Sequence, residues 1–257
     1  MNPTLEVIAR RKSTRAFSEQ PLTEEQKEAI LQAAFRAPTA GNMMLYSIIE
    51  VADQEIKDKL VQTCDNQPFI AKSPYVLLFL ADYQRWWDYF SFCKAEERCL
   101  ELGLKTRSPQ EGDLMLACCD ALIAAQTAVI AAESLGIGSC YIGDIVENYE
   151  IHRDLFSLPR YVFPIAMLCF GFPRAGRSDR QVPRYDREFI LHKDSYIRLN
   201  DEQLQRMAKP MEERAAGKYF KGAENLGQSF YLRKFIAEFS FEMSRSAREM
   251  IKNWTGE

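Results

Sequence analysis

The segment RRKSTRAF, residues 10–17, places four cationic side chains around two hydroxyl groups close to the N-terminus. Its polar residues are Arg10, Arg11, Lys12, Ser13, Thr14 and Arg15. Guanidinium groups supply paired hydrogen-bond donors, lysine a point charge and serine a further donor, and this is a donor set that binds phosphate. Cations are also favourable at a helix C-terminus, so a solvated helix end is the alternative. The pattern therefore indicates an anion site or an exposed helix terminus.

A second segment, APTAGNMMLY at residues 37–46, combines small residues with hydrogen-bonding side chains. Pro38 is expected to end a helix, and the small residues that follow leave the backbone open to a flat ligand. Thr39 and Asn42 add side-chain donors and acceptors. An ordinary loop between a helix and a strand has the same composition, so both interpretations stay open for this segment alone.

Two later segments are further candidates for ligand contact. The glycines of GIGSCYIGD, residues 136–144, follow a predicted helix and precede a predicted strand. A dinucleotide fingerprint has the opposite order, so we interpret the segment as a packed turn or as a close backbone approach to a ligand at Gly143. VPRYDREF, residues 182–189, carries Arg184 and Arg187, which would either complete an anion site or lie in a solvated loop.

Composition limits the classes of function. The chain has 257 residues and a net charge of −3, so we expect one sizeable domain, with or without an appendage, and no general nucleic-acid or membrane surface. Charged residues precede any long apolar run, which argues against a signal peptide. Seven cysteines without a C-x-x-C spacing, and two histidines without metal-ligand spacing to a cysteine, predict reduced thiols in a cytoplasmic protein and no metal site.

The elements that must position these segments follow from hydrophobic periodicity and capping signals. Predicted helices cover residues 4–11, 23–36, 54–62, 113–135 and 148–156, and predicted strands cover 45–52, 75–81, 139–145 and 162–172. Two C-terminal segments, 201–217 and 228–254, are also helical in pattern. Residues 82–112 are irregular in pattern, and the aromatic stretch 83–92 predicts either a wall over a ligand or internal packing.

The predicted helix 113–135 is unusually apolar, yet it contains Asp120, Gln126 and Glu133. Spanning helices rarely carry that many polar groups, so we expect a buried helix that is packed on both sides. An obligate dimer would bury such a helix between its subunits. We interpret Asp120 as a buried polar contact and not as a catalytic group.

The four segments, in this order, resemble the FMN-dependent nitroreductase family over roughly residues 5–190. The family pattern R-R-S-x-R-x-F is occupied by Arg11, Lys12, Ser13, Arg15 and Phe17. APTAGNMMLY is similar to the family segment A-P-S-x-x-N-x-Q-P-W, and DALIAAQTAVIAAESLGIGSCYIGD is similar to the family's long helix and its G-L-G-S-C-W-I-G turn.

Two departures from the family pattern concern the ligand pocket. The Q-P-W triplet is replaced by Met44, Leu45 and Tyr46, so any contact by that glutamine is lost. The frequent tryptophan of the C-W-I-G turn is Tyr141. The residues outside the resemblance are those in which such enzymes differ in substrate, so the physiological acceptor and the choice of NADH or NADPH are not readable.

The resemblance implies a fold as well as an activity. We expect an α+β, nitroreductase-like fold with a central, mixed but mostly antiparallel sheet flanked by helices. We also expect a homodimer in which a C-terminal extension wraps the partner. Residues 1–196 would then form the FMN-binding domain, and residues 197–257 a helical extension packed on the dimer.

The resemblance also implies a set of FMN contacts. In chain order these are Arg11, Lys12, Ser13, Arg15, Pro38, Thr39, Ala40, Asn42, Gln67, Ile142, Gly143 and Arg184. The N-terminal group and Arg184 would hold the phosphate and ribityl chain, with Arg15 near the edge of the flavin ring. The sequence does not tell whether Arg180 or Arg187 shares the phosphate site with Arg184. The segment 38–42 would come from the other subunit. Gln67 would meet the pyrimidine edge, and Ile142 and Gly143 would face the ring through backbone groups.

No catalytic side chain is expected, because the bound FMN carries the chemistry. The implied reaction is two-electron, ping-pong reduction of a small-molecule acceptor, such as a nitroaromatic, a quinone or a flavin, by NADH or NADPH. Three alternatives stay open from the sequence. They are a reductive dehalogenase or flavin-modifying enzyme of the same fold, a non-catalytic flavin-binding protein, and an anion-binding α+β protein without flavin.

Overall fold

The computed structural model describes residues 2–176 and 181–256 of the chain. The chain folds into two compact units, one of Met1–Arg177 with Glu242–Glu257 and one of Ser178–Phe241. The predicted boundary between residues 196 and 197 lies inside the second of these units and stays a prediction about domains. The candidate site residues belong to the first unit, with the exception of Arg184.

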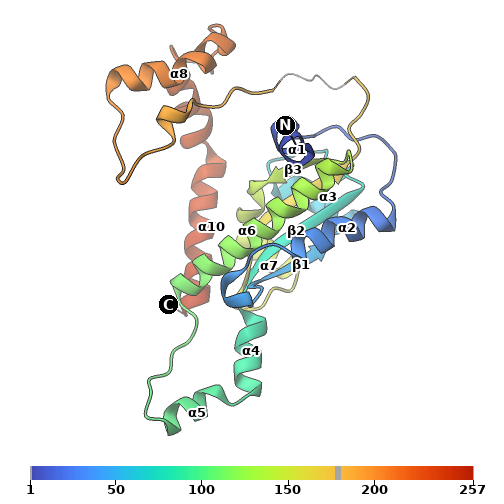
Figure 1. Ribbon diagram of the computed structural model, residues 1–257, viewed down its shortest axis with the longest axis vertical. Helices are drawn as coiled ribbons and strands as arrows, with labels where there is room; N and C mark the ends of the chain where they lie inside the picture. The colour runs from blue at the N-terminus through green and yellow to red at the C-terminus, as the bar shows by residue number, and fades with distance from the viewer. Residues whose placement is uncertain (1, 177–180, 257) are drawn as a thin grey trace. The chain divides into compact units, whose positions relative to one another are not determined.

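The first unit is built on a four-stranded sheet (Figure 1). In spatial order its strands are β1 (Tyr46–Glu50), β2 (Tyr75–Asp82), β4 (Val162–Gly171) and β3 (Gly138–Ile142), and each neighbouring pair is antiparallel. Every residue of β2 is buried. Because β2 and β4 lie in the middle and are covered on both faces, their sequences are continuous apolar runs, as predicted. β3 is an edge strand, so one side of its backbone is open to other pairing.

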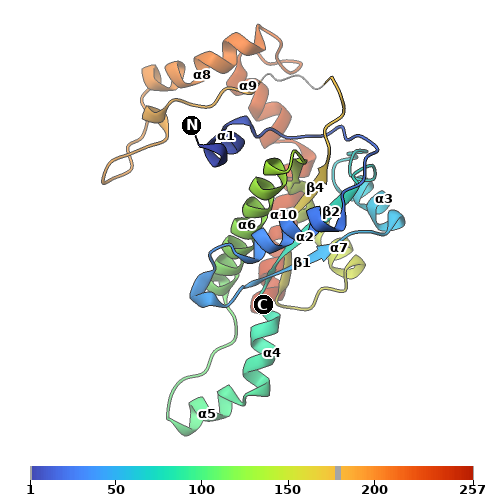
Figure 2. The ribbon, with the colours of Figure 1, turned by 45° about the vertical axis from the view of Figure 1, so that its right-hand side comes forward.

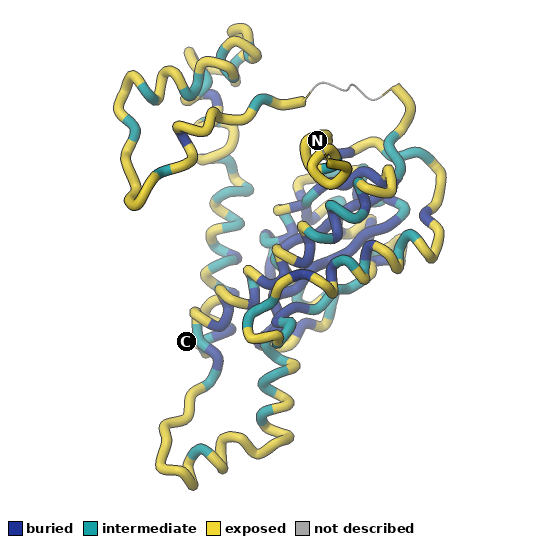
Figure 3. The backbone as a smooth tube through the Cα atoms, in the orientation of Figure 1, coloured by how far each residue is buried: buried dark blue, intermediate teal, exposed yellow. Residues whose placement is uncertain are grey.

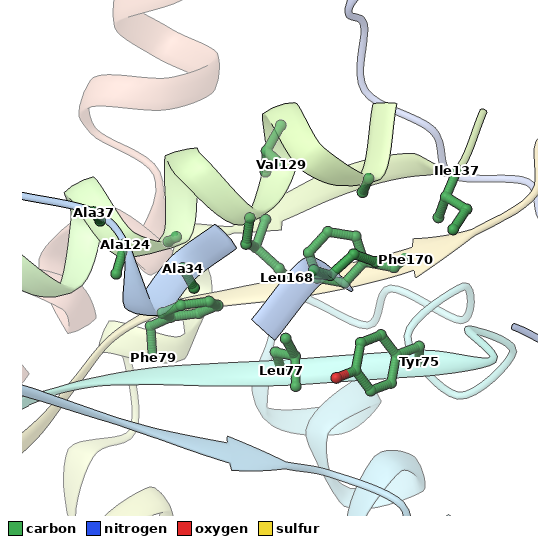
Figure 4. Close-up of a cluster of buried hydrophobic side chains, with 14 of the residues drawn as sticks. Ala34, Ala37, Tyr75, Leu77, Phe79, Ala124, Val129, Ile137, Leu168 and Phe170 are labelled. Atoms are coloured by element: carbon green, nitrogen blue, oxygen red, sulfur yellow. The ribbon is translucent and has the colours of Figure 1, made fainter. Parts of the chain in front are cut away.

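Helices cover both faces of this sheet. The first unit contains α1 (Pro3–Arg10), α2 (Glu24–Phe35), α3 (Gln54–Thr63), α4 (Gln84–Phe92), α5 (Ala95–Glu101), α6 (Glu111–Ser134) and α7 (Tyr149–Leu155). Side chains of α2 and α6 pack with Leu77, Leu168 and Phe170 on one face (Figure 4). Side chains of α3 pack with Leu78 and Met167 on the other face. The predicted α+β architecture is therefore confirmed.

The central helix α6 is buried on one side only. Small residues such as Ala121 and Ala128 are buried, whereas Met115, Leu116 and Ile123 are exposed. Figure 3 shows both buried and exposed stretches along this helix. The expectation of packing on both sides is therefore wrong within a single chain, because no described element of the first unit covers this face. By length and composition α6 would also pass as a membrane span, a test that the core helix of a soluble protein passes equally.

The segment between β2 and α6 holds two helices that the sequence pattern did not predict. α4 and α5 bury none of their side chains completely and begin without side-chain caps, so the usual helix signals are absent. Trp86 and Trp87 pack against the core cluster that contains Tyr161 and Trp254. Both tryptophans therefore pack internally, which is one of the two roles predicted for residues 83–92.

The second unit is helical. It contains α8 (Asp201–Ala215), α9 (Leu226–Phe230) and a π-helical turn, η4 (Tyr231–Phe235). The last helix, α10 (Glu238–Thr255), begins there, but most of its length belongs to the first unit. In that unit Met250 and Trp254 are buried, and the Trp254 indole donates to the Gln110 carbonyl at 3.1 Å.

Candidate functional site

The basic segment lies along the open edge of β3. Ser13 pairs with Ser139 in a short parallel bridge, and the Thr14 backbone N–H donates to the Ser139 carbonyl at 2.8 Å. Farther on, the Ser18 N–H donates to the Phe172 carbonyl at 2.8 Å. The segment therefore uses backbone groups that an edge strand leaves unpaired, and this positions Arg11 to Arg15 beside the strand.

Two glycines allow this close approach. A Cβ on Gly138 would lie 2.2 Å from the Thr14 hydroxyl oxygen, and a Cβ on Gly171 would lie 2.7 Å from the Phe17 ring. Both glycines are needed for packing against the basic segment, which fits the packed-turn interpretation of residues 136–144. At Gly143, by contrast, a Cβ would meet no atom within 4 Å, so the backbone there faces open space.

The guanidinium groups of Arg11 and Arg15 are available to an anion. Within residues 2–176 and 181–256, no carboxylate forms an ion pair with either of them. Burial raises the pKa of the Cys140 thiol, and the positive charges of Arg15 and Arg11 oppose that rise. Both arginines therefore act electrostatically on Cys140 of β3, three residues before Gly143.

Gln67 reaches the same end of β3 from the loop after α3. Its Nε2 donates to the Asp144 carboxylate at 2.8 Å and to the Cys64 carbonyl at 3.1 Å. Asp144 immediately follows Gly143 in the short helix η2 (Gly143–Val146). Ile142 is buried in the core, so a ligand would meet it only through the backbone. The structure thus brings Gln67 to the end of β3, where Asp144 follows Ile142 and Gly143.

The loop from Pro38 to Leu45 is held by Asp120 of α6. The Thr39 hydroxyl donates to this carboxylate, as do the N–H groups of Ala40 at 3.0 Å and Leu45 at 3.1 Å. Asp120 is only 3% exposed, which confirms its interpretation as a buried polar contact. The Thr39 hydroxyl and the Ala40 N–H are engaged within the chain.

The backbone of this loop takes conformations that are unusual for residues with side chains. Asn42 has φ 59° and Met44 has φ 50°, and both lie in the left-handed region together with Gly41. Such a geometry persists only where neighbouring contacts impose it, and it is common at binding sites. The Thr39 hydroxyl, which accepts the Met44 N–H at 2.8 Å, supplies one of these contacts. Pro38 and Asn42 are exposed.

Helix α4 supplies the other contacts of the loop. The Trp86 indole donates to the Met43 carbonyl at 2.7 Å, and the Arg85 guanidinium donates to the carbonyls of Met44 and Tyr46. Sequence reasoning missed Arg85 as a residue that holds this loop. Its partners lie 39 and 41 residues away in the chain, so no local spacing could reveal the contact.

The two groups of candidate residues lie at opposite ends of α6 (Figure 2). The loop is fixed at Asp120, and the basic segment is attached just beyond Ser134, where the helix ends. Fourteen residues of helix correspond to about 21 Å along the axis. Within one chain, the loop and the basic segment therefore lie apart, and we call them the two candidate half-sites.

Comparison with known proteins assigns the chain to a family. Residues 8–172 match the model of the Nitroreductase family. The chain belongs to the nitroreductase family. This confirms both the family and the fold that the four segments predicted.

Several nitroreductase-family relatives are similar over most of this chain. The oxygen-insensitive NADPH nitroreductase of Salmonella typhimurium is 33% identical over 206 residues and is covered to 80%, as is this chain. The FMN reductase (NAD(P)H) of Bacillus subtilis is 32% identical over 244 residues, which cover 91% of this chain and 93% of that protein. The solved structure of B. megaterium NfrA1 matches with a TM-score of 0.77 at 30% identity, covering 97% of this chain and 98% of that one.

One predicted contact of the nitroreductase site belongs to the second unit. Arg184 is exposed, and its guanidinium donates to the Val182 carbonyl at 3.5 Å. Arg187 opens the short helix η3 (Arg187–Phe189). Arg180 lies outside the described residues. The participation of these arginines in a phosphate site stays a prediction.

Proposed function

We propose that this nitroreductase-family chain is a dimeric, FMN-dependent enzyme. It would pass two electrons from NAD(P)H to a small oxidised acceptor, such as a nitroaromatic, a quinone or a flavin, in ping-pong order. The broader statement follows from the family and from the relatives named above: the chain is an NAD(P)H-dependent oxidoreductase of the nitroreductase type, with FMN and NAD(P)H as cofactors. The acceptor, the kinetic order and the individual contacts are parts of the proposal.

The residues present fit FMN, and one observation carries this conclusion. At β3, the guanidiniums of Arg11 and Arg15 pair with no carboxylate of the described residues and act on the Cys140 thiol, and three residues farther on the backbone faces open space at Gly143. Arginine suits phosphate because its planar fork of donors forms charge-assisted hydrogen bonds. A backbone without a side chain suits a flat ring because the ring approaches it closely. The arginines act on β3, and the open backbone follows directly after β3. This order suits a ligand that has a phosphate at one end and a ring at the other.

The residues around β3 would then divide into phosphate contacts and ring contacts. Arg11, Lys12, Ser13 and Arg15 bind the phosphate and the ribityl chain, and Gln67 and Gly143 orient the ring. A guanidinium that reaches the ring edge provides preorganised positive charge where negative charge develops during reduction. When bound, FMN supplies the two-electron redox chemistry. NAD(P)H and the acceptor would occupy the same pocket in turn, because no second chemical group is required.

A homodimer would unite the two half-sites. The exposed apolar face of α6, which includes Met115, Leu116 and Ile123, is of the kind that obligate interfaces bury. Around a two-fold axis across α6, the basic segment of one chain meets the 38–42 loop of its partner. Both observations support a dimer with two composite sites. The wrapping of a C-terminal extension around the partner stays a prediction.

The test begins with the cofactor. Denaturation of the purified protein should release FMN in a ratio of one per chain, and NADH or NADPH should bleach the bound flavin without an added acceptor. A panel of nitroaromatics, quinones, free flavins and halophenols, run with each nicotinamide, then identifies the acceptor. Release of FAD, or no binding of flavin after reconstitution, would overturn the proposal. A flavin that neither nicotinamide bleaches would indicate a binding protein.

A further inference from the structure

Glu147 is a buried acid next to the proposed ring-binding residues. It follows η2, its side chain is 5% exposed, and its Oε1 has no hydrogen-bond partner among the residues that the structure describes. Its carboxyl group interacts with the carboxyl group of Asp144, and its backbone N–H donates to the Asp144 carbonyl at 3.0 Å. A buried carboxylate without a partner is costly, whereas a protonated carboxyl donates a hydrogen bond.

The surroundings of Glu147 favour its neutral form from every side. The acidic residues nearest to it are Asp144 in η2, Asp65 after α3 and Glu242 in α10. Burial, followed by the charge of Asp144, raises the pKa of Glu147 to about 8. Arg245, a cation on α10, is already engaged with Glu150 and Glu242.

Two other titratable groups of this region supply no positive charge. Burial lowers the pKa of His152, whose Nδ1 donates to the Ile145 carbonyl at 2.9 Å and whose Nε2 lies 2.8 Å from the Thr63 hydroxyl. Burial also raises the pKa of the Cys64 thiol to about 12, so the thiol is neutral at physiological pH. Glu147 therefore has no cationic partner in the described part of the chain, and a proton is what removes its charge.

We propose that Glu147 is a positioning residue of the flavin site: its neutral carboxyl donates to Asp144, and this holds the Asp144 carboxylate where Gln67 binds it. The inference rests on the proposed function, because Gln67 and Gly143 are the proposed ring contacts. In the structure, the Glu147 N–H donates to the Asp144 carbonyl at 3.0 Å, and the Asp144 carboxylate accepts the Gln67 amide at 2.8 Å. Glu147 itself would touch neither the cofactor nor the substrate.

Ionisation of Glu147 would weaken this arrangement. It places a second negative charge against Asp144 in a buried setting, so the two carboxylates repel and the anchor of Gln67 loosens. If FMN binds the form with neutral Glu147, its apparent Kd is the intrinsic Kd divided by the neutral fraction, so one pH unit above the pKa it is about tenfold higher. Affinity for FMN should therefore fall between about pH 7 and pH 9.

The same ionisation affects folding in a defined direction. The pKa of Glu147 is raised in the folded chain from its ordinary value of 4.5 to about 8. Below the pKa of Glu147 in the unfolded chain, the carboxyl group is neutral in both states, and its ionisation does not affect stability. As the pH rises from there through the pKa in the folded chain, the folded state loses stability relative to the unfolded state. Glu147→Gln keeps a donor for Asp144 without this titration. Its stability advantage over the wild type should therefore grow from about pH 5 to pH 8.

The experiment compares wild-type apo-protein with Glu147→Gln and with Glu55→Gln, which changes an exposed carboxyl on α3. FMN is titrated into each from pH 6.5 to pH 9 and followed by flavin fluorescence. We expect the Kd of the wild type and of Glu55→Gln to rise about tenfold more than that of Glu147→Gln. Parallel curves for the wild type and Glu147→Gln would overturn the inference.

Urea unfolding of the same apo-proteins gives a readout that needs no cofactor. The free energy of unfolding of Glu147→Gln minus that of the wild type should increase from pH 5 to pH 8. A constant difference would refute the claim that Glu147 is protonated in the folded chain. Failure of the proposed function looks different. In that case the wild type binds no FMN even at pH 6.5, whatever the unfolding curves show.

Discussion

The Asp120 carboxylate accepts the backbone N–H of Ala40 at 3.0 Å, and this contact joins the central helix to the loop that carries one of the proposed half-sites. The same carboxylate accepts the Thr39 hydroxyl and the Leu45 N–H. One buried side chain therefore determines the shape of the loop. The position of Asn42, which we expect to face FMN in the partner, depends on it.

Replacement of this carboxylate should damage both the fold and the cofactor site. In Asp120→Asn one oxygen becomes an amide nitrogen that faces N–H donors. Because hydrogen bonds to charged groups contribute roughly 1.5–3 kcal/mol each, we expect the free energy of unfolding to fall by about 3 kcal/mol. Urea unfolding and FMN content measure the two effects. Asp58→Asn, at an exposed position of α3, is the matched control, and an Asp120→Asn protein as stable and as yellow as this control would contradict the role of Asp120.

Two glycines of the same segment should respond differently to alanine. In Gly138→Ala the new methyl group overlaps the Thr14 hydroxyl, so the basic segment must shift, and overpacking of this kind costs roughly 1–3 kcal/mol. In Gly143→Ala the methyl group enters open space, so the stability of the apo-protein should stay unchanged while FMN binds more weakly. Thermal unfolding and FMN titration separate these outcomes. Unchanged FMN affinity in Gly143→Ala would remove Gly143 from the site.

The exposed face of α6 should control assembly. Ile123→Glu places a charge in the proposed interface, and we expect monomers with little bound FMN. Ile151→Glu is the control, because Ile151 has the same exposed fraction, 41%, but lies on α7. Sedimentation velocity at low micromolar concentration reports the oligomeric state. An Ile123→Glu dimer that is loaded with flavin would show that this face of α6 is not the interface.

Local signals in the sequence predicted much of the fold. The capping box of Thr23 and Gln26 gives the start of α2, and the apolar runs of β2 and β4 are the covered central strands. α4 and α5 were not predicted, because they lack capping side chains and bury no residue completely. The tryptophans of α4 contact Met43 and Tyr161, which lie far away in the sequence.

The candidate site residues could be named from the sequence, but the contacts between them could not. Gln67 binds Asp144 across 77 residues, and Thr39 binds Asp120 across 81. Contacts of this kind depend on which loops the sheet brings together, and no spacing rule encodes them. The burial of Glu147 is equally invisible in the sequence, because glutamate side chains are usually exposed. Asp144 and Glu147 therefore entered the site only with the structure.

The central claim is that each FMN site combines the basic segment of one chain with the 38–42 loop of the other. Co-expression of Arg15→Ala with Asn42→Gly tests it directly, because each variant alone carries a lesion in both sites of its homodimer. Glycine is chosen because Asn42 has a positive φ, which glycine adopts without strain.

A heterodimer of the two variants has one doubly damaged site and one intact site. With random pairing, about a quarter of all sites should be intact. FMN content and NAD(P)H-dependent bleaching should therefore exceed those of either variant alone by about a quarter of the wild-type value. If each chain instead builds its whole site, the co-expressed protein shows only the average of the two variants. Such an average, measured on folded dimers with matched protein concentration, would contradict the composite site.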